Sequence, residues 1–254
     1  MKQNTESVKH HFDSYAKNGD WQNLYRRNAS TYSVAFELRF KAYAEILERK
    51  QPVSVLDLGC GSGDFLAALP RSVAVYHGID LSSEMIASAM RSARNASAGR
   101  SRNISFEVAD LLEVAATKKY DFVIASGLTE YFEDINPIMT KVLEFTSPNG
   151  WAVVQTPNRL LSRWGGQSKV FVKEKGFFHH RLSPDELDSI AADCGFDKEG
   201  GKLVNHSYLR GTHRLPNLYR FLDRRLAKLA PYSYNVTKAS MYIGVYTPRP
   251  RISL

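Results

Sequence analysis

The sequence is poor in cysteine and contains no long apolar segment. Its 254 residues include two cysteines, Cys60 and Cys194, which form no CxxC pair and are too few for a disulfide framework. No run approaches the roughly 20 apolar residues that span a bilayer. Residues 1–20 are polar and of mixed charge, where a secretory signal would have an apolar core. We therefore expect a cytoplasmic protein without a metal centre.

Charge is unevenly distributed along an otherwise globular composition. From residue 201 onward there are ten basic residues and one acid, whereas the first 200 residues contain 24 basic and 25 acidic side chains. This asymmetry predicts an anionic partner. In the helix expected over 217–230, an apolar stripe accompanies the basic residues Arg220, Arg224, Arg225 and Lys228. Two interpretations stay open: a surface helix over the sheet with solvated arginines, or a contact with a membrane surface, a carrier protein or an acidic substrate.

Strand-like and helix-like segments alternate through the middle of the chain, after a helical N-terminal segment over 1–50 that is either a lead-in or a lid. Short β-branched runs predict strands over 53–58, 73–79, 104–108, 121–126, 151–156 and 241–246. Helices are expected over 65–69, 83–95, 138–145 and 184–194. This alternation is typical of a doubly wound α/β sheet with parallel strands. Residues 51–254 are expected to form one domain, with insertions at 157–183 and 211–240.

Three alternating glycines, Gly59, Gly61 and Gly63, directly follow the first strand. Such a turn brings bare backbone close to a ligand. A dinucleotide site would have a third glycine in the pattern GxGxxG, but Asp64 occupies that position, and no GxxxxGK[ST] loop is present. A second acid, Asp57, precedes the loop, so the pair disfavours a diphosphate and suits a ligand with a positive centre. S-adenosylmethionine, a sulfonium with an amino group and no phosphate, fits this pattern.

Acidic residues also follow the next two strands. Asp80 lies seventeen residues after Gly63, at the end of the second strand, where a carboxylate can accept both ribose hydroxyls. Asp110 follows the third strand, in reach of an adenine amino group, and the fourth strand ends at Ser126. Because the carboxyl ends of strands in an open α/β sheet share one crevice, these groups are expected to lie together.

The order of these motifs resembles that of the class I SAM-dependent methyltransferases over roughly residues 50–200. The resemblance implies a Rossmann-like, mostly parallel seven-stranded sheet with a substrate cap. It implies that the glycines line the methionine half of the cofactor, that Asp80 holds the ribose, and that Asp110 with Leu111 holds the adenine. The expected cofactor-binding residues are Asp57, Gly59, Cys60, Gly61, Gly63, Asp80, Leu81, Met85, Asp110, Leu111 and Ser126.

The segments after the fourth strand resemble the small-molecule branch that includes quinone-biosynthesis and Mg-protoporphyrin methyltransferases. A Glu-His pair often follows the fourth strand there, whereas this chain has Glu130-Tyr131. If the acceptor is a hydroxyl, a base must take its proton, and the expected catalytic residues are His180, His179, Glu130 and Tyr131. An anionic or lipid- or carrier-linked oxygen acceptor is favoured, with nitrogen or carbon as alternatives. RNA is a lesser alternative, because the Pro-Pro tetrad of base methylases is absent after the fourth strand.

Overall fold

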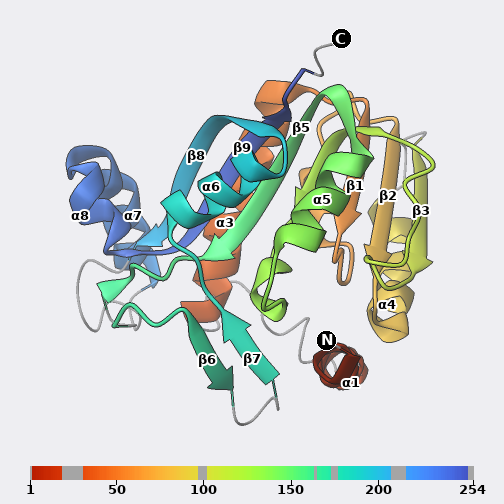
Figure 1. Cartoon of the computed structure of the whole chain (residues 1–254), viewed down its shortest axis with the longest axis horizontal. Helices are drawn as coiled ribbons and strands as arrows, with labels where there is room; N and C mark the ends of the chain where they lie inside the picture. The colour runs from red at the N-terminus through yellow and green to blue at the C-terminus, as the bar shows by residue number, and fades with distance from the viewer. Residues whose placement is uncertain are drawn as a thin grey trace.

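The computed structural model describes residues 2–18, 31–96, 102–162, 165–172, 177–206 and 216–250. A single seven-stranded sheet organises the chain, and helices cover both of its faces (Figure 1). The helices are α1 (Lys2–Lys17), α3 (Thr31–Lys50), α4 (Ser83–Ala96), α5 (Asn136–Phe145), α6 (Pro184–Asp193), α7 (Pro216–Leu229) and α8 (Tyr232–Val236). None of these helices is long and apolar enough to cross a membrane.

The main sheet has the strand order β3-β2-β1-β4-β5-β9-β8. Its strands are β1 (Ser54–Leu58), β2 (Val75–Asp80), β3 (Asn103–Val108), β4 (Tyr120–Ala125), β5 (Thr146–Pro157), β8 (Phe196–His206) and β9 (Ala239–Pro248). The first five are parallel, and β9 runs antiparallel between β5 and β8. The expected Rossmann-like fold is therefore confirmed, with the carboxyl ends of β1, β2, β3 and β4 at one edge.

Two layers of apolar side chains hold the sheet between its helices. Alternate residues of each central strand point to opposite faces, so Val55 joins a core with α3, whereas Leu56 joins a core with α5 and α6. Both side chains are fully buried. This two-sided burial explains why the central strands are nearly continuous apolar runs, and it fixes the edge at which polar residues emerge.

The segment after β1 differs from the expected helix. It forms only a short 3-10 helix, η1 (Asp64–Ala68), because Pro70 follows closely and Leu69 adopts the extended conformation favoured before proline. The strand β8 was not expected, because the charged, glycine-containing stretch from Asp197 to Lys202 is typical of a loop. The insertion expected over 157–183 contains a hairpin of β6 (Lys169–Val172) and β7 (Phe177–His180).

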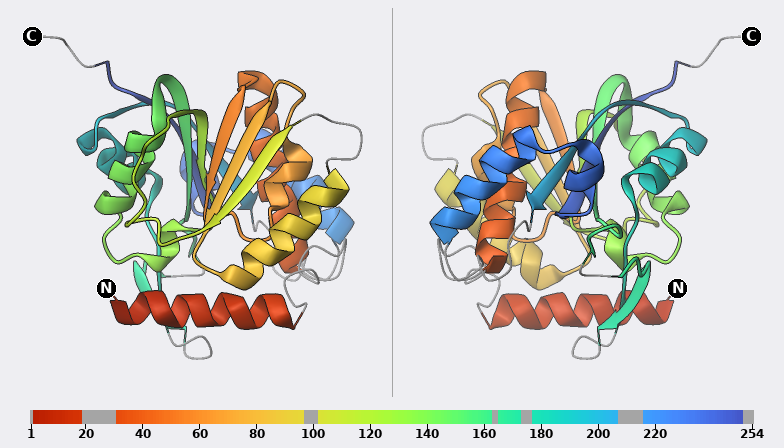
Figure 2. Two further views of the ribbon diagram at one scale, coloured as in Figure 1. Left: turned by 90° about the vertical axis from the view of Figure 1, so that its right-hand side faces the viewer. Right: turned by 90° about the vertical axis from the view of Figure 1, so that its left-hand side faces the viewer.

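Helix α1 lies across the carboxyl ends of the parallel strands rather than against either face of the sheet (Figure 2). It packs against α4 at one end of the sheet edge and against β7 further along. Residues 19–30, which link α1 to α3, lie outside the described residues, as does part of the expected insertion at 211–240. The division into a lead-in or lid and a cofactor domain stays a prediction.

One of the two glycines of β8, Gly201, makes room for a buried tyrosine of β9. A Cβ on Gly201 would come within 2.2 Å of the Tyr242 hydroxyl, whereas a Cβ on the neighbouring Gly200 would meet nothing within 4 Å. Tyr242 cannot move away easily, because its side chain is buried and its hydroxyl donates to Asp188 of α6 at 3.0 Å.

We therefore expect Gly201→Ala to lower the free energy of unfolding by about 1–3 kcal/mol, as overpacking does in buried sites. Gly200→Ala, one residue away, is the matched control and should change it by less than about 0.5 kcal/mol. Urea denaturation of the two variants measures the difference. Equal losses would show that strand propensity, not the packing of Tyr242, requires the glycine.

Candidate active site

The loop after β1 is shaped by backbone conformations that only glycine adopts readily. Gly59, Gly61 and Gly63 have φ values of 70°, 53° and 75°. The N–H groups of Gly59 and Cys60 both donate to the carbonyl of Ile79 on β2, at 2.8 and 3.1 Å. The loop therefore passes over the end of β2, with bare backbone at the carboxyl edge of the sheet.

The side chain of Cys60 packs beneath this loop. A Cβ on Gly78 would lie 2.8 Å from the Cys60 Sγ, so the thiol rests against the backbone of β2. Burial raises the pKa of this thiol well above its ordinary value, and the charge of Asp57 adds to the effect. Cys60 can therefore line a ligand site only through its backbone.

The carboxylate of Asp80 joins β2 to the glycine loop and to α4. One oxygen accepts from the backbone N–H of Gly61 at 2.8 Å, and the other accepts from the N–H of Ser82 at 2.9 Å. Burial raises the pKa of Asp80, while these two N–H donors oppose the rise and the charge of Asp13 adds to it. Each oxygen keeps a lone pair for a further donor, as a ligand with two neighbouring hydroxyls requires.

Asp13, on α1, anchors that helix to the same place. Its carboxylate accepts from the Ser82 hydroxyl at 2.5 Å, and Ser82 in turn caps α4 by accepting from the N–H of Met85 at 3.1 Å. An acid beside the first turn of a helix is favourable because of the positive end of the helix dipole. This contact holds α1 over the edge of the sheet (Figure 2).

The end of β3 stands beside Asp80. The N–H of Ala109 donates to the Asp80 carbonyl at 3.0 Å, and the Asp110 side chain accepts from the N–H of Leu112 at 3.0 Å. Leu111 is buried in the apolar core, and Met85 is buried at the start of α4. Asp80 and Asp110 thus lie at neighbouring strand ends, as the sequence predicts.

Asp57 lies inside the molecule and not on the crevice wall. It is 1% exposed, and it accepts a hydrogen bond of 2.7 Å from the hydroxyl of Tyr76. Burial raises the pKa of Asp57 from 3.8 to about 7, although the Tyr76 hydrogen bond opposes the rise. Its contribution to a ligand site is therefore mainly the charge that it carries beneath the loop.

The sequence reasoning missed two residues that α3 contributes to this region. A Cβ on Gly127, whose φ is 67°, would lie 3.1 Å from Nη1 of Arg39 and 3.8 Å from Oε1 of Glu130. The guanidinium and the carboxylate therefore flank the turn after β4. Tyr43, one helical turn beyond Arg39, is fully buried, and burial raises its pKa while Ser126 and Arg39 oppose the rise. The spacing of Arg39 and Tyr43, four residues apart, places them on one face of the helix, but it does not indicate that this face meets the turn after β4.

Gln155 of β5 also fixes the turn after β4. Its side-chain oxygen lies 3.2 Å from the Ser126 hydroxyl and 3.1 Å from the N–H of Gly127, both of which donate to it. Ser126 therefore points into the sheet, and the next polar groups to emerge are those of η2 (Thr129–Tyr131).

An aromatic wall stands above this turn. We define it by Phe12 of α1, Tyr131 of η2, and Phe177 and His179 of β7. The Tyr131 ring lies 5.3–5.5 Å from the other three, in edge-to-face geometry. Burial raises the pKa of Tyr131 well above its ordinary value, and Glu130 adds to this. Tyr131 at neutral pH is thus an un-ionised hydroxyl in an apolar setting.

The two adjacent histidines face opposite sides of β7. His179 belongs to the aromatic wall, whereas His180 lines a cavity of about 290 Å³ with Lys169, Glu133 and Arg181. Burial lowers the pKa of His180, and the charge of Lys169 lowers it further. At most one of the two imidazoles can therefore face the crevice. Among the described residues, no group of three or more His, Cys, Asp or Glu side chains could hold a metal ion.

Residues 25–199, more than half of the chain, match the family described as a methyltransferase domain. The chain belongs to this family. The expected class I SAM-dependent methyltransferase is therefore confirmed, and S-adenosylmethionine is its cofactor.

Related methyltransferases are 25–28% identical to this chain over the aligned segments. Trans-aconitate 2-methyltransferase of Pseudomonas aeruginosa is 28% identical over 80% of this chain and 67% of its own. A ubiquinone biosynthesis O-methyltransferase of Hydrogenovibrio crunogenus is 26% identical over 67% of this chain and 70% of its own. Among solved structures, magnesium protoporphyrin IX methyltransferase from Synechocystis with bound SAM matches with a TM-score of 0.67, at 15% identity and 97% coverage of both chains.

The raised pKa of Asp57 predicts a pH-dependent stability. The unfolded chain releases this proton near pH 3.8, but the folded chain keeps it until about pH 7, so stability falls as pH rises through this window. The loss is up to about 1.4 kcal/mol per pH unit. Asp57→Asn cannot titrate, so the free energy of unfolding of the variant should rise relative to wild type between pH 5 and about pH 7. Urea denaturation at both pH values tests this, and a pH-independent difference would contradict it.

Proposed function

We propose that this methyltransferase moves the methyl group of SAM to an oxygen of a small anionic acceptor. The observation that carries the proposal is that a charged pair of side chains and the aromatic wall meet at the turn after β4. Arg39 and Glu130 flank its backbone, and the aromatic wall stands above it. A charged end of the cofactor and an acceptor with an apolar body can meet there.

The residues present suit the cofactor well. Asp80 would accept the ribose hydroxyls with its remaining lone pairs, and the backbone beside Asp110 and Leu111 would hold the adenine. The glycine loop would face the methionine half, with Arg39 available to its carboxylate and Glu130, with the ionised form of Asp57, to its ammonium. When bound, SAM supplies an electrophilic methyl group on a positively charged sulfur. Helix α1, tied down by Asp13, serves as the lid.

On the acceptor side, this chain's residues position the nucleophilic oxygen and remove its proton where it has one. His179 is the base for a hydroxyl acceptor, and Tyr131, as an un-ionised hydrogen-bond donor, orients the acceptor oxygen. A carboxylate acceptor needs no base. The ubiquinone biosynthesis O-methyltransferases support oxygen as the acceptor atom, and trans-aconitate 2-methyltransferase supports an anionic acceptor. Nitrogen remains the second candidate, because a phosphoethanolamine N-methyltransferase of wheat is 28% identical over 77% of this chain.

The cofactor assignment predicts that two variants lose different ligands. Asp80→Ala should weaken both S-adenosylhomocysteine and 5′-methylthioadenosine by about 10–100-fold, because both contain the ribose. Arg39→Gln should weaken only S-adenosylhomocysteine, by about tenfold or more, because 5′-methylthioadenosine lacks the amino-acid carboxylate. Titration calorimetry measures all four dissociation constants. If Arg39→Gln weakened both ligands equally, Arg39 would support the site only indirectly.

The opposite facing of the two histidines supplies a matched pair of variants. His179→Gln should lower methyl transfer from labelled SAM to a metabolite extract by about 100-fold or more, because the base is lost. His180→Gln, the adjacent control on the outer side of β7, should stay within about twofold. Affinity for S-adenosylhomocysteine should be unchanged in both, which separates a catalytic loss from a damaged fold. Full activity of His179→Gln would remove its role as base and favour a carboxylate acceptor.

A further inference from the structure

Helix α7 exposes three of its large apolar side chains to solvent. Its inward residues include Tyr219, which is 8% exposed, and Asp223, whose carboxylate is largely covered. By contrast, Leu218, Phe221 and Leu229 are 42%, 57% and 79% exposed. Of the two interpretations that the sequence left open, packing of the apolar stripe over the sheet does not hold for these three residues.

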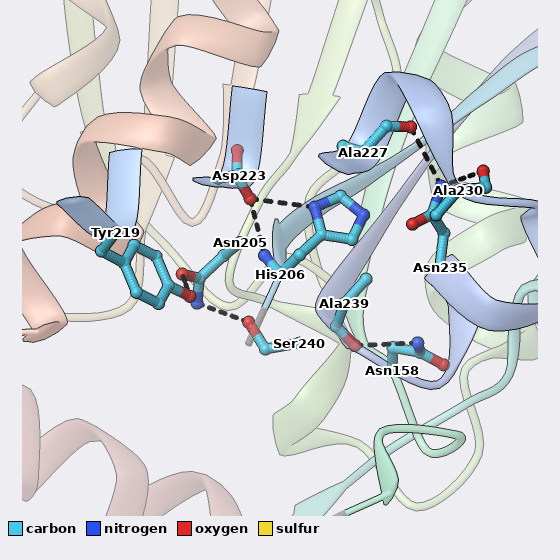
Figure 3. A network of polar contacts seen from close by, with 10 residues as sticks. All are labelled: Asn158, Asn205, His206, Tyr219, Asp223, Ala227, Ala230, Asn235, Ala239 and Ser240. Atoms are coloured by element: carbon cyan, nitrogen blue, oxygen red, sulfur yellow. Dashed lines mark hydrogen bonds and ion pairs between the residues drawn. The ribbon is translucent and has the colours of Figure 1, made fainter. Parts of the chain in front are cut away.

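A polar network fixes this rotation of the helix (Figure 3). Asp223 accepts from the backbone N–H of His206 at 2.7 Å and pairs with the His206 ring at 2.9 Å. The Tyr219 hydroxyl donates to Asn205 at 2.7 Å, and Asn235 of α8 donates to the carbonyls of Ala227, in α7, and of Ala230, just after it. Turning the apolar side chains inward would break these buried contacts, so their exposure is built into the structure.

Basic side chains interleave with the exposed apolar ones. Arg225 and Lys228 are exposed, and the Arg225 guanidinium lies 5.9 Å from the centre of the Phe221 ring. In the described residues neither forms an ion pair with a carboxylate. Arg220, which was expected to act with them, instead binds Glu37 of α3 through several hydrogen bonds. We name Leu218, Phe221, Arg225, Lys228 and Leu229 the outer face of α7.

The size and composition of this face distinguish it from an ordinary surface. Of the eight large apolar or aromatic residues that stand exposed in the described part of the chain, five lie on α7 and α8. The only acid between residues 216 and 250 is Asp223, which points inward to His206. A second copy of this chain is a poor partner for the face, because a symmetric contact would bring like charges together.

We propose that the outer face of α7 docks on an anionic lipid surface. Leu218, Phe221 and Leu229 enter the boundary between headgroups and acyl chains, and Arg225 and Lys228 contact the headgroup phosphates. A helix lying in the plane of the membrane with this division of side chains binds through buried apolar area and through attraction to anionic lipids. The docking does not depend on methyl transfer, and its test needs neither cofactor nor acceptor.

The experiment is sedimentation of the full chain with phosphatidylcholine vesicles that contain or lack phosphatidylglycerol. We expect partitioning only onto the anionic vesicles, and salt should weaken it. Arg225→Gln with Lys228→Gln should lower the partition constant by about 25-fold, since each charge near the surface contributes about fivefold, or about 1 kcal/mol. Leu218→Ser with Phe221→Ser should lower it by about tenfold or more.

Helix α4 offers matched controls for both changes. Met90→Ser and Arg91→Gln remove an exposed apolar and an exposed basic residue there, and should leave the partition constant within about twofold. Thermal midpoints confirm that all variants fold. Failure of the wild type to bind anionic vesicles overturns the proposal, and so does equal binding by the α7 variants. A dimer or a complex with RNA that the α7 changes alone abolish, without vesicle binding, assigns the face to that partner and also overturns it.

Discussion

The hydrogen bond from the backbone N–H of Gly61 to the Asp80 carboxylate, 2.8 Å long, holds together the parts on which the site depends. It fixes a loop of left-handed glycines against the end of β2. The other Asp80 oxygen accepts from the backbone N–H of Ser82. Ser82 caps α4, and its hydroxyl donates to Asp13 of α1. One carboxylate therefore sets the position of the loop, of the helix behind it and of the helix above the crevice.

This arrangement carries an electrostatic cost that a suitable ligand reduces. Burial raises the pKa of Asp57 to about 7 and also raises that of Asp80, so both carboxylates are held in a setting that opposes their charge. Among the described residues near them, Arg39 is the cation whose charge lowers the pKa of Asp57. A ligand with two positive groups and one carboxylate balances the acids and pairs with Arg39. A diphosphate would worsen the imbalance, which explains why this glycine loop differs from a dinucleotide loop.

The sequence predicts best what depends on local chemistry at strand ends. Asp80 and Asp110 could be located because an acid directly after a buried strand must emerge at the carboxyl edge. Arg39 could not, because its approach to Gly127 depends on how α3 crosses the sheet. The direction of His179 and His180 was open because a strand alternates its faces, and only the packing of β7 against η2 and α1 decides between them. The strand β8 was hidden because Gly201, which gives space to Tyr242, is a residue typical of turns.

Helix α7 shows how buried polar groups can override apolar periodicity. Burying one leucine or phenylalanine side chain stabilises a fold by about 1.5–3 kcal/mol. The apolar stripe of α7 has three exposed members. Breaking the contact of Asp223 with His206 would leave a buried charge unpaired, at a cost of about 3–5 kcal/mol, and would also remove the hydrogen bond from Tyr219 to Asn205. The free energy lost by exposing the apolar side chains and the free energy held in the polar contacts are similar in size. The polar network can therefore hold the helix with these apolar side chains outward. A surface that covers Leu218, Phe221 and Leu229 recovers their burial free energy without breaking the polar network. Because Arg225 and Lys228 lie among these residues, an anionic surface is favoured.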